Sequence, residues 1–465
     1  MAFEEFREAI DRVSAVFRKV PKDKKVKLVT NYDADGISAG AILARMLERD
    51  GRKYDVEILA QLKEDLIERM GGEEYEVFLF SDFGSGQLEA LNRCLKGKIV
   101  FVMDHHDIQG EAEEWIHQLN PHLFGIDDDK AISGSGVSYL FAKAVDDRNR
   151  DMAHVAIIGA IGDVQENDGF TGLNCELLAD AVAGGRIVVE RGPRLFGLQT
   201  RDIHKLLEYG SDLKIPGVTG NESGAVAFLQ GLGIDVRNGC GFRKYADLSV
   251  EERDRLIAGI VMRRQRLDRP EDILTNVYRI VGETGLFSDA KEVSTLLNAC
   301  GRLDRGELGL GVCLNDAVKK REALEHMKDY RRMIVKGIQW YHRNKKGDRV
   351  LRGDNYMIVN AGSDVLHTII GTIMSIVSKS GDFEDGFYLM GLARNPDDGL
   401  TKVSLRVTGN DPSIDLKSIV VDLVGVTGGE AGGHQFACGA NIPVDVEDEF
   451  IRLAEKRFGE LCVLK

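Results

Sequence analysis

The sequence predicts an α/β protein with an N-terminal domain built on a parallel sheet, a mainly helical insertion, and a smaller C-terminal α/β domain. Three observations lead to this prediction. Strand-like and helix-like runs alternate over roughly the first 165 residues, helical runs separated by Gly- and Asn-rich loops follow, and strand–helix alternation resumes near residue 355. Such alternation is typical of a parallel sheet whose two faces are covered by helices.

The N-terminal domain is assigned to residues 1–189. Its predicted strands are short runs rich in Val, Leu, Ile and Phe, at residues 26–31, 55–61, 77–82 and 98–104. Its predicted helices are residues 38–49, 63–70, 87–96, 133–145 and 153–161. In open parallel sheets, binding sites form at the carboxyl ends of the strands. Acidic residues follow several of these strands, so we expect the functional site at that edge.

The rest of the chain divides into three segments. Residues 190–290 form the insertion, residues 291–346 return to the first domain and continue as a long connecting helix, and residues 347–465 form the C-terminal domain. The connecting helix spans residues 315–346. It is either a solvated surface or a nucleic-acid contact. Its basic residues are Lys319, Lys320, Arg321, Lys328, Arg331, Arg332, Lys336, Arg343, Lys345 and Lys346.

Composition excludes several classes of protein. Among 465 residues no run of eighteen is apolar, so we expect no membrane span. The charged N-terminus lacks the apolar core of a signal peptide, which indicates a cytoplasmic protein. The seven scattered cysteines include no CxxC pair and are expected to be reduced. The net charge of −14 argues against non-specific coating of nucleic acid, but it permits a local basic groove.

Acidic and imidazole side chains gather in four motifs. Asp33 and Asp35 lie in the run NYDADG after the first strand, and Asp82 lies in SDFG after another strand. The triplet Asp104-His105-His106 follows a further strand, and Asp163 ends the apolar helix GAIGD. Taken singly, these motifs also fit an Asp-rich turn, a helix cap, a paired-His turn without metal, and a solvent-facing loop.

Their conjunction favours a metal site. Carboxylates and an imidazole from several strand and helix ends of one sheet suit Mn²⁺, with Mg²⁺ or Co²⁺ as alternatives. An acid at a helix C-terminus is unfavourable unless a cation compensates for the helix dipole. Two metal ions a few ångströms apart activate water and stabilise the leaving oxygen in phosphoryl chemistry.

The order DxDG, D, DHH and GxxGD resembles the DHH phosphoesterase superfamily, and within it the RecJ-like nucleases. The run NACGR at residues 298–302 is similar to the NAAGR element of RecJ proteins. The run GGHQFACG at residues 432–439 is similar to the glycine-rich loop of the DHH-associated domain, although alone it also fits a flexible turn. Length and domain order are similar to those of archaeal RecJ-like proteins, including the GINS-associated nucleases.

The resemblance implies roles for individual residues. Asp104 would support the metal ligands, and His106 would contact the scissile phosphate. Asn31 departs from the His or acid of many relatives, which affects the occupancy of one metal site. The implied metal ligands are Asp33, Asp35, Asp82, His105 and Asp163, and the catalytic set adds Asp104 and His106. The implied substrate-binding residues are Ser133, Ser135, Ser138, Arg302, Arg406, Gly432, Gly433 and His434.

The resemblance also implies a function: a two-metal exonuclease acting on single-stranded DNA, and on RNA as an option, in DNA repair and replication. The polarity leans to 5′-to-3′, and oligomeric state is not predicted. GINS and the replicative helicase are the implied partners. We expect the insertion, which lacks an acid cluster and has His204 as its one His, to dock a protein, although it also fits a brace for the cleft. The alternative functions are a phosphodiesterase of short oligonucleotides or cyclic dinucleotides, and a mainly structural replisome subunit.

Overall fold

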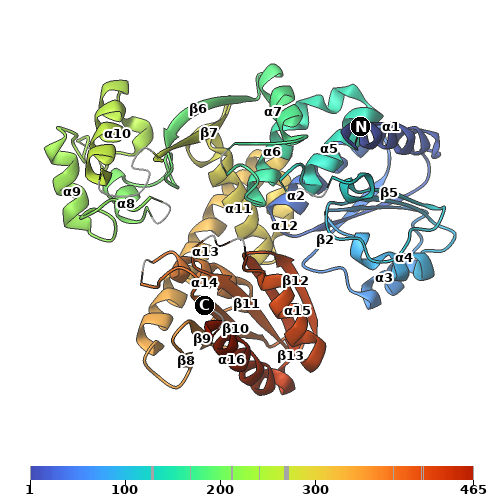
Figure 1. The fold of residues 1–465 in the computed structure, drawn as a ribbon. Helices are drawn as coiled ribbons and strands as arrows, with labels where there is room; N and C mark the ends of the chain where they lie inside the picture. The colour runs from blue at the N-terminus through green and yellow to red at the C-terminus, as the bar shows by residue number, and fades with distance from the viewer. Residues whose placement is uncertain are drawn as a thin grey trace. The chain divides into compact units, whose positions relative to one another are not determined.

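The computed structural model describes residues 2–126, 130–167, 169–210, 213–239, 241–265, 272–380, 382–409, 411 and 413–463 (Figure 1). The chain divides into two compact units, residues 1–327 and 328–465, and each is considered by itself. Among the described residues, no helix has both the length and the apolar character needed to cross a membrane. The free thiols of the described part are Cys94, Cys175, Cys300, Cys313 and Cys438; Cys240 lies outside the described residues.

A five-stranded parallel sheet forms the centre of the first unit, as predicted. The strand order is β2-β1-β3-β4-β5, so β3 lies between β1 and β4. β5 was not predicted, because its four residues IHQL alternate too briefly to be recognised as a strand. The strands are β1 Val26–Asn31, β2 Tyr54–Leu59, β3 Val77–Ser81, β4 Ile99–Met103 and β5 Ile116–Leu119.

Helices cover this sheet. α2 begins directly after β1 and is buried along almost its whole length, because it also packs on α5 and α6. α6 is apolar apart from His154, which suits a helix buried on nearly all sides. The helices of this part are α1 Ala2–Lys19, α2 Ala34–Arg49, α3 Glu64–Gly71, α4 Leu88–Cys94, α5 Gly134–Val145, α6 Ala153–Gly162 and α7 Asn174–Ala183.

The insertion is helical but is entered and left through a two-stranded antiparallel ribbon. The ribbon pairs β6 (Ile187–Pro193) with β7 (Leu274–Ile280). Between them, α8 (Ile203–Glu208), α9 (Glu222–Gly231) and α10 (Val250–Arg264) group together (Figure 1). They enclose a hydrophobic core of their own, which includes Leu206, Leu229 and Leu256. The ribbon was not predicted, because β6 carries Glu and Arg where a buried strand would be apolar.

Three helices follow the insertion. α11 (Ala290–Arg302) returns to the first domain and packs against α6 and α2, and α12 (Gly306–Cys313) packs against α2. The predicted long helix is confirmed as α13 (Ala317–Asn344), and the boundary between the two units falls within it.

A six-stranded mixed sheet forms the second unit and confirms the predicted smaller α/β domain. Its order is β12-β13-β11-β10-β9-β8, with β9 and β10 parallel and the other pairs antiparallel. The run after α15 was predicted as a glycine-rich loop, but Glu430–His434 forms strand β12. Glycine has a low strand propensity, so the strand is stabilised by its pairing with β13. The other strands are β8 Val350–Arg352, β9 Tyr356–Asn360, β10 Tyr388–Asn395, β11 Leu400–Val407 and β13 Ala437–Pro443, and the further helices are α14 Ile370–Ser378, α15 Leu416–Thr427 and α16 Glu447–Val463.

Candidate metal centre

Three neighbouring strands of the parallel sheet end at the same level. Thr30 of β1 pairs in register with Ser81 of β3, and Ser81 pairs with Met103 of β4. Each strand is followed by a predicted site residue: β1 by the DxDG turn, β3 by Asp82, and β4 by the DHH triplet. The strand order therefore places Asp82 between the other two motifs.

The imidazole of His105 lies among three carboxylates. Its Nε2 is 3.3 Å from Oδ2 of Asp163, 3.4 Å from Oδ1 of Asp82 and 3.9 Å from Oδ2 of Asp35. Nδ1 of His106 lies 3.9 Å from Oδ1 of Asp82 on the other side. Asp35, His105 and Asp163 thus offer ligand atoms within 4.8 Å of one another, and so do Asp82, His105 and His106. This spacing and donor set suit a divalent cation.

Asp82 has an unusual environment for a carboxylate. It is almost fully buried, and the described part of the chain gives neither of its side-chain oxygens a hydrogen-bond donor. Burial raises its pKa well above the usual range, and the charges of Asp33 and Asp35 raise it further. Its φ of 61° lies in the left-handed region, which costs a non-glycine residue conformational energy. A buried carboxylate without donors is expensive unless a cation binds it, so the site fits a metal ion.

Asp35 is held by the start of α5. The backbone N–H of Ser135 donates to both Asp35 oxygens at 3.2 Å, and the Ser135 hydroxyl donates to Oδ1 at 2.5 Å. The hydroxyl of Ser133 lies 2.9 Å from that of Ser135 and also accepts the N–H of Gly136 at 3.3 Å. The predicted substrate-binding residues Ser133, Ser135 and Ser138 are fully buried, so the first two use their hydroxyls within the protein.

Two glycines permit this close packing. A Cβ on Gly134 would lie 2.5 Å from Oδ1 of Asp82, and a Cβ on Gly159 would lie 2.2 Å from the Ser135 hydroxyl and 2.5 Å from Oδ1 of Asp35. The sequence analysis did not single out either position. The signal was present in the motifs SGSG and GxxG, since glycines beside acids often mark a close approach of the backbone.

Asp104 orients the DHH triplet. Its carboxylate accepts the backbone N–H groups of Ser85, His105 and His106 at 2.8 to 3.2 Å, and contacts Nδ1 of His106 at 2.8 Å. Burial works against its ionisation, but the charge and hydrogen bond of His106 outweigh burial, so the pKa of Asp104 is lowered. Desolvation likewise opposes the charge on His106, yet Asp104 raises its pKa to about 9. The His106 side chain is 45% exposed, so a charged donor faces solvent beside the cluster.

The NACGR run of α11 packs on the DxDG turn. The side-chain oxygen of Asn298 accepts the N–H of Ala34 at 3.1 Å, and Gly301 lies so close to the Tyr32 carbonyl that any side chain would collide with it. Asp33 caps α2 by accepting the N–H of Gly36 at 2.9 Å. Burial raises the pKa of Asp33, whereas this hydrogen bond and the charge of Arg302 lower it. Arg302 was expected to bind substrate, whereas Asn298 was recognised only as part of the NACGR run and was given no role; its side chain positions the turn.

Asn31 turns toward its own backbone. Its side-chain oxygen accepts the N–H of Tyr32 at 2.7 Å. An amide used in this way is a weaker candidate ligand than a carboxylate or imidazole. The cluster around His105 is therefore the better-defined cation site, in line with the departure noted in the sequence.

The predicted residues of the second unit lie on its sheet. Nε of Arg406 donates to the Ser375 hydroxyl at 2.9 Å, and its Nη1 donates to the carbonyl oxygens of Leu405 and Cys438. Gly432 and Gly433 lie in β12, where a Cβ on Gly433 would collide with the backbone of β13. The backbone of His434 ends β12, but its side chain lies outside the described part.

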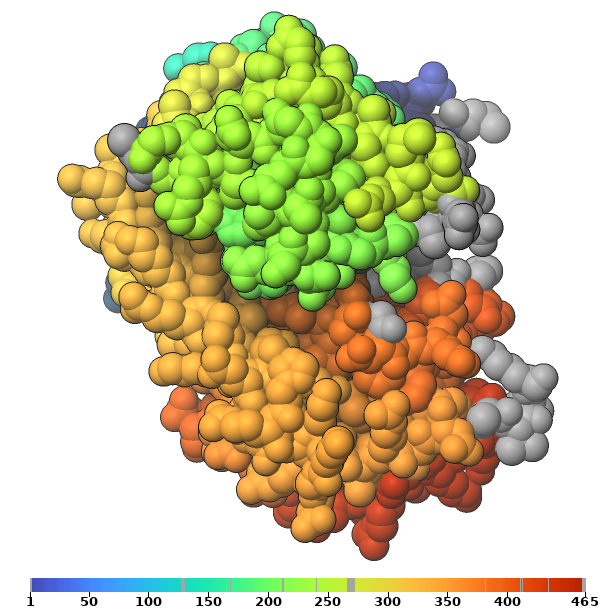
Figure 2. Space-filling model, turned by 90° about the vertical axis from the view of Figure 1, so that its left-hand side faces the viewer, coloured from blue at the N-terminus to red at the C-terminus, as the bar shows by residue number. Residues whose placement is uncertain are grey.

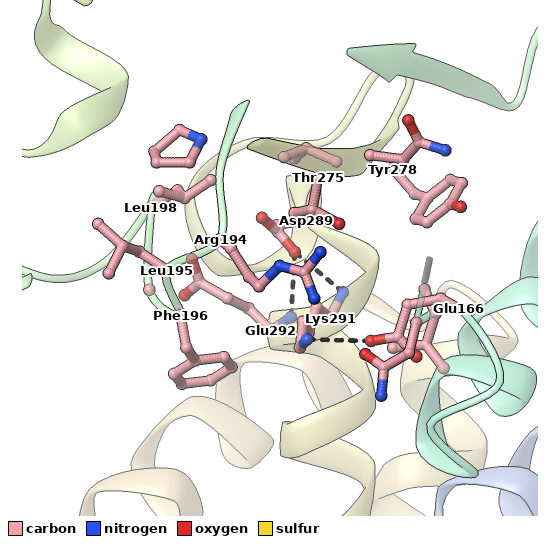
Figure 3. Close-up of a pocket in the computed structure, with 16 residues that line it drawn as sticks. Glu166, Arg194, Leu195, Phe196, Leu198, Thr275, Tyr278, Asp289, Lys291 and Glu292 are labelled. Atoms are coloured by element: carbon pink, nitrogen blue, oxygen red, sulfur yellow. Dashed lines mark hydrogen bonds and ion pairs between the residues drawn. The ribbon is translucent and has the colours of Figure 1, made fainter. Parts of the chain in front are cut away.

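A separate pocket with both apolar and charged lining residues lies where the insertion meets the first domain (Figure 3). Glu166, three residues after Asp163, contacts Nζ of Lys291 at 2.9 Å. The Glu292 carboxylate accepts the N–H of Gln199 at 2.8 Å and the hydroxyl of Thr200 at 2.6 Å. These contacts fasten the entry of the insertion to α11, the helix that also carries Asn298.

Three family models match the chain in the order expected. The DHH family N-terminal domain matches residues 25–161, the DHH-CID domain matches residues 195–276, and the DHHA1 domain matches residues 354–460. The uncharacterized protein MJ0831 of Methanocaldococcus jannaschii is 27% identical over 454 residues, covering 94% of this chain and 93% of that protein.

Solved structures share the fold. RecJ of Thermus thermophilus in complex with Mn²⁺ aligns at a TM-score of 0.59 with 17% identity, over 98% of this chain and 55% of that one, so this chain spans about half of that RecJ. CDC45 of Entamoeba histolytica aligns at a TM-score of 0.64 with 12% identity, over 98% and 99% of the two chains. The three family models in sequence show that the chain belongs to the DHH superfamily, and its fold is similar to that of RecJ.

Proposed function

We propose that this protein is a metal-dependent exonuclease that hydrolyses phosphodiester bonds of single-stranded nucleic acid, with DNA as the main substrate and repair and replication as its setting. The observation that carries the proposal is Asp82, a buried carboxylate without hydrogen-bond donors in the described chain, 3.4 Å from His105 Nε2. An arrangement that costs stability in the free protein indicates that a bound cation completes the site.

Asp33, Asp35, Asp82, His105 and Asp163 would hold two divalent ions, with Mn²⁺ preferred by the mixed oxygen and nitrogen donors and Mg²⁺ or Co²⁺ as alternatives. When bound, such ions neutralise phosphate charge and activate water for attack on phosphorus. Ser135 orients Asp35 through its backbone N–H and its hydroxyl, and Asp104 orients the imidazole of His106 and the backbone of His105. His106, whose pKa is raised by Asp104, would donate to a non-bridging oxygen of the scissile phosphate.

Substrate contacts outside the metal cluster are proposed for Arg302 in the first unit and for Arg406, Gly432, Gly433 and His434 in the second. Arg406 is fixed by Ser375 and by two backbone carbonyls, so little rotamer freedom is lost when it binds an anion. Ser133, Ser135 and Ser138 are buried, which supports a positioning role at the start of α5 over a direct phosphate contact.

End-labelled oligonucleotides test the proposal. Single-stranded DNA, single-stranded RNA and duplex DNA, each labelled at either end, are incubated with the full chain and Mn²⁺, Mg²⁺ or Co²⁺. We expect stepwise shortening of single-stranded DNA, loss of activity in EDTA, and protection of duplex. The position of the label gives the polarity. Hydrolysis confined to dinucleotides or cyclic dinucleotides would instead support the small-molecule phosphodiesterase, and no hydrolysis with any metal would support a structural replisome subunit.

A second proposed function, docking to GINS and through it to the replicative helicase, is favoured by a groove on the insertion. The groove, of about 560 Å³, lies between α9 and α10, on the part coloured green in Figure 2. Its exposed walls are Ala227, Gly231, Ala258 and Met262, and its charged lining residues are arginines, Arg255 and Arg263. On a chain with a net charge of −14, such a surface suits an apolar segment flanked by acids. The CDC45-like fold supports replisome proteins as the source of that segment.

A further inference from the structure

The two faces of β11 in the second unit have different roles. Val403, Leu405 and Val407 point into the hydrophobic core together with α15 and α16. Because side chains alternate along a strand, Lys402, Ser404 and Arg406 lie on the opposite face. α14 covers part of that face: a Cβ on its residue Gly371 would lie 2.9 Å from the Ser404 hydroxyl and 3.3 Å from Nη2 of Arg406.

Lys402 is a sheltered cation without an anionic partner in the described chain. It is partly buried, and no hydrogen bond or ion pair of its ammonium group is found among the described residues. Burial lowers its pKa, and the charge of Arg406 lowers it further. Other sheltered lysines are paired: Lys27 lies 2.7 Å from Glu57, and Lys143 lies 2.5 Å from Asp180. Lys402 therefore stands out among the lysines of an acidic protein.

The turn before α14 adds two polar atoms without partners. The 3-10 turn His367–Ile369 lies against β10 and β11. Nδ1 of His367 and the hydroxyl of Thr368 are buried, and neither has a hydrogen-bond partner among the residues described. Burial lowers the pKa of His367, and so does the charge of Lys402 on the neighbouring strand. A buried polar group without a hydrogen-bond partner lowers stability by about 1–3 kcal/mol, so two such groups in one turn indicate that a ligand binds them.

The residues opposite Lys402 on the neighbouring strands are not bulky. Its neighbours across the sheet are Ala393 on β10 and Asn441 on β13, and those of Ser404 are Gly391 and Gly439. A small residue and an amide thus flank the cation on the neighbouring strands, while Ile370 and Met374 of α14 cover Gly391 further along the face.

We propose that Lys402, His367 and Thr368 form an anion subsite that binds a backbone phosphate of the single-stranded substrate, beside the phosphate contacted by Arg406. This inference rests on the proposed function for the identity of the ligand. Lys402 supplies the charge, and the neutral imidazole and the hydroxyl each supply one hydrogen-bond donor. Lys402 and Arg406 are four residues apart, about 13 Å along a strand, which suits two phosphates of one chain better than one phosphate.

Nearby acids limit the site on one side. Asp397 and Asp398, in the turn between β10 and β11, raise the pKa of His367 and would repel an anion that approached from there. Both residues are exposed, and the Asp398 carboxylate accepts the N–H of Leu400 at 3.0 Å. The phosphate is therefore expected on the side of Lys402 that faces away from this turn.

Salt dependence of binding is the first test. Anisotropy of a fluorescent single-stranded oligonucleotide is measured with the full chain in EDTA over a range of salt. Each phosphate contact on a single strand adds about 0.7 to the slope of log affinity against log salt. We expect Lys402→Met to lower that slope by about 0.7 and to weaken binding about tenfold. Lys402→Arg should retain the slope, and Lys456→Met, on exposed α16, is the matched control that should behave as wild type.

A neutral phosphate locates the contact. In oligonucleotides that carry one methylphosphonate at successive positions, one position should weaken binding to wild type and to Lys456→Met but not to Lys402→Met. Thr368→Val adds an independent readout: it should raise the melting temperature by removing a buried unpaired hydroxyl, while weakening phosphate binding. An unchanged salt slope in Lys402→Met, or a methylphosphonate profile equal to that of wild type, would overturn the subsite.

Inorganic phosphate separates the subsite from the proposed function. Phosphate should raise the melting temperature of wild type and Lys456→Met but not of Lys402→Met. If phosphate stabilises the protein through Lys402 while no single strand binds, the anion subsite is upheld and the nuclease proposal is wrong. If single strands bind and Lys402→Met is indistinguishable from wild type in both assays, the nuclease proposal stands and the subsite is wrong.

Discussion

The hydroxyl of Ser135 lies 2.5 Å from Oδ1 of Asp35, and the backbone N–H of the same serine donates to that carboxylate. Two elements 100 residues apart in sequence are thereby joined at the candidate metal centre, and Asp35 is held close to His105 by the protein alone. Ser135→Ala should weaken Mn²⁺ binding and lower kcat about tenfold, because one of the bonds that fix a ligand is lost. Calorimetric titration with Mn²⁺ and single-turnover hydrolysis measure both effects.

Ser14→Ala is the matched control for this serine. Ser14 is also fully buried, and its hydroxyl donates to a backbone carbonyl of α1, far in sequence from the cluster. Both variants should lose about 1 kcal/mol of stability. Equal Mn²⁺ affinity in the two variants would show that Ser135 only stabilises the fold.

Asp82→Asn should abolish hydrolysis while raising the melting temperature of the metal-free protein. The substitution removes a buried charge crowded by Asp33 and Asp35, and asparagine tolerates the left-handed backbone at this position. Scanning calorimetry with and without Mn²⁺ measures the two effects separately: wild type should gain more stability from Mn²⁺ than the variant. A metal-free variant that melts below wild type would argue against charge crowding at Asp82.

Gly159→Ala should displace residues of the candidate metal centre, although Gly159 itself has no side chain that could bind a metal. The added methyl would lie 2.2 Å from the Ser135 hydroxyl and 2.5 Å from Asp35, so α5 and α6 must separate at a cost of about 1–3 kcal/mol. Gly425→Ala in α15 is the control, since no atom lies within 4 Å of its added Cβ, and it should be neutral or stabilising. Thermal melts and Mn²⁺ titrations of both variants measure stability and metal affinity. Wild-type Mn²⁺ affinity in Gly159→Ala would show that α6 does not pack this closely against Ser135 and Asp35.

Arg406→Ala and His434→Ala should impair substrate use more than metal binding. We expect a loss of about 1–3 kcal/mol in kcat/KM for each, seen mainly in KM, with Mn²⁺ affinity unchanged. Steady-state hydrolysis over a range of single-strand concentrations provides the measurement. Unaltered kinetics in both variants would remove these residues from the substrate site.

Gly231→Trp should block the groove between α9 and α10. No atom lies within 4 Å of a Cβ at this position, so the indole can enter the groove without straining the insertion. Binding of the cognate GINS complex, measured by calorimetry on the full chain, should fall at least about tenfold in this variant and in Arg255→Glu. Arg237→Glu, an exposed residue of the insertion outside the groove, is the control. Full GINS affinity in these variants would mean that the insertion has a structural role and does not bind GINS through this groove.

The convergence of the acids and histidines could be predicted from the sequence better than the contacts that hold them. Asp82 and Asp104 follow apolar strands, and parallel strands end at a common edge, so their convergence follows from the predicted fold. The role of Ser135 did not follow, because it depends on how closely α5 and α6 approach Asp35, and that distance is set by Gly134 and Gly159.

Elements with weak local patterns were also missed. β5 is too short to show a period, the β6 strand is exposed and charged, and β12 is rich in glycine. Each is specified by its pairing partner in the folded chain and not by its own residues. The subsite around Lys402 was likewise invisible in the sequence, since an unpaired lysine is recognised only when its neighbours in space are known.

Anomalous diffraction from crystals soaked in Mn²⁺ is the most direct test of the metal centre. A strong manganese peak is predicted within bonding distance of His105 Nε2 and of carboxylate oxygens of Asp35, Asp82 and Asp163, with a second, weaker peak near Asp33 because Asn31 is a poor ligand. The peak at His105 should vanish in Asp82→Asn crystals. Absence of manganese at His105 in wild-type crystals, with binding elsewhere on the protein, would contradict the assignment of this cluster as the catalytic metal centre.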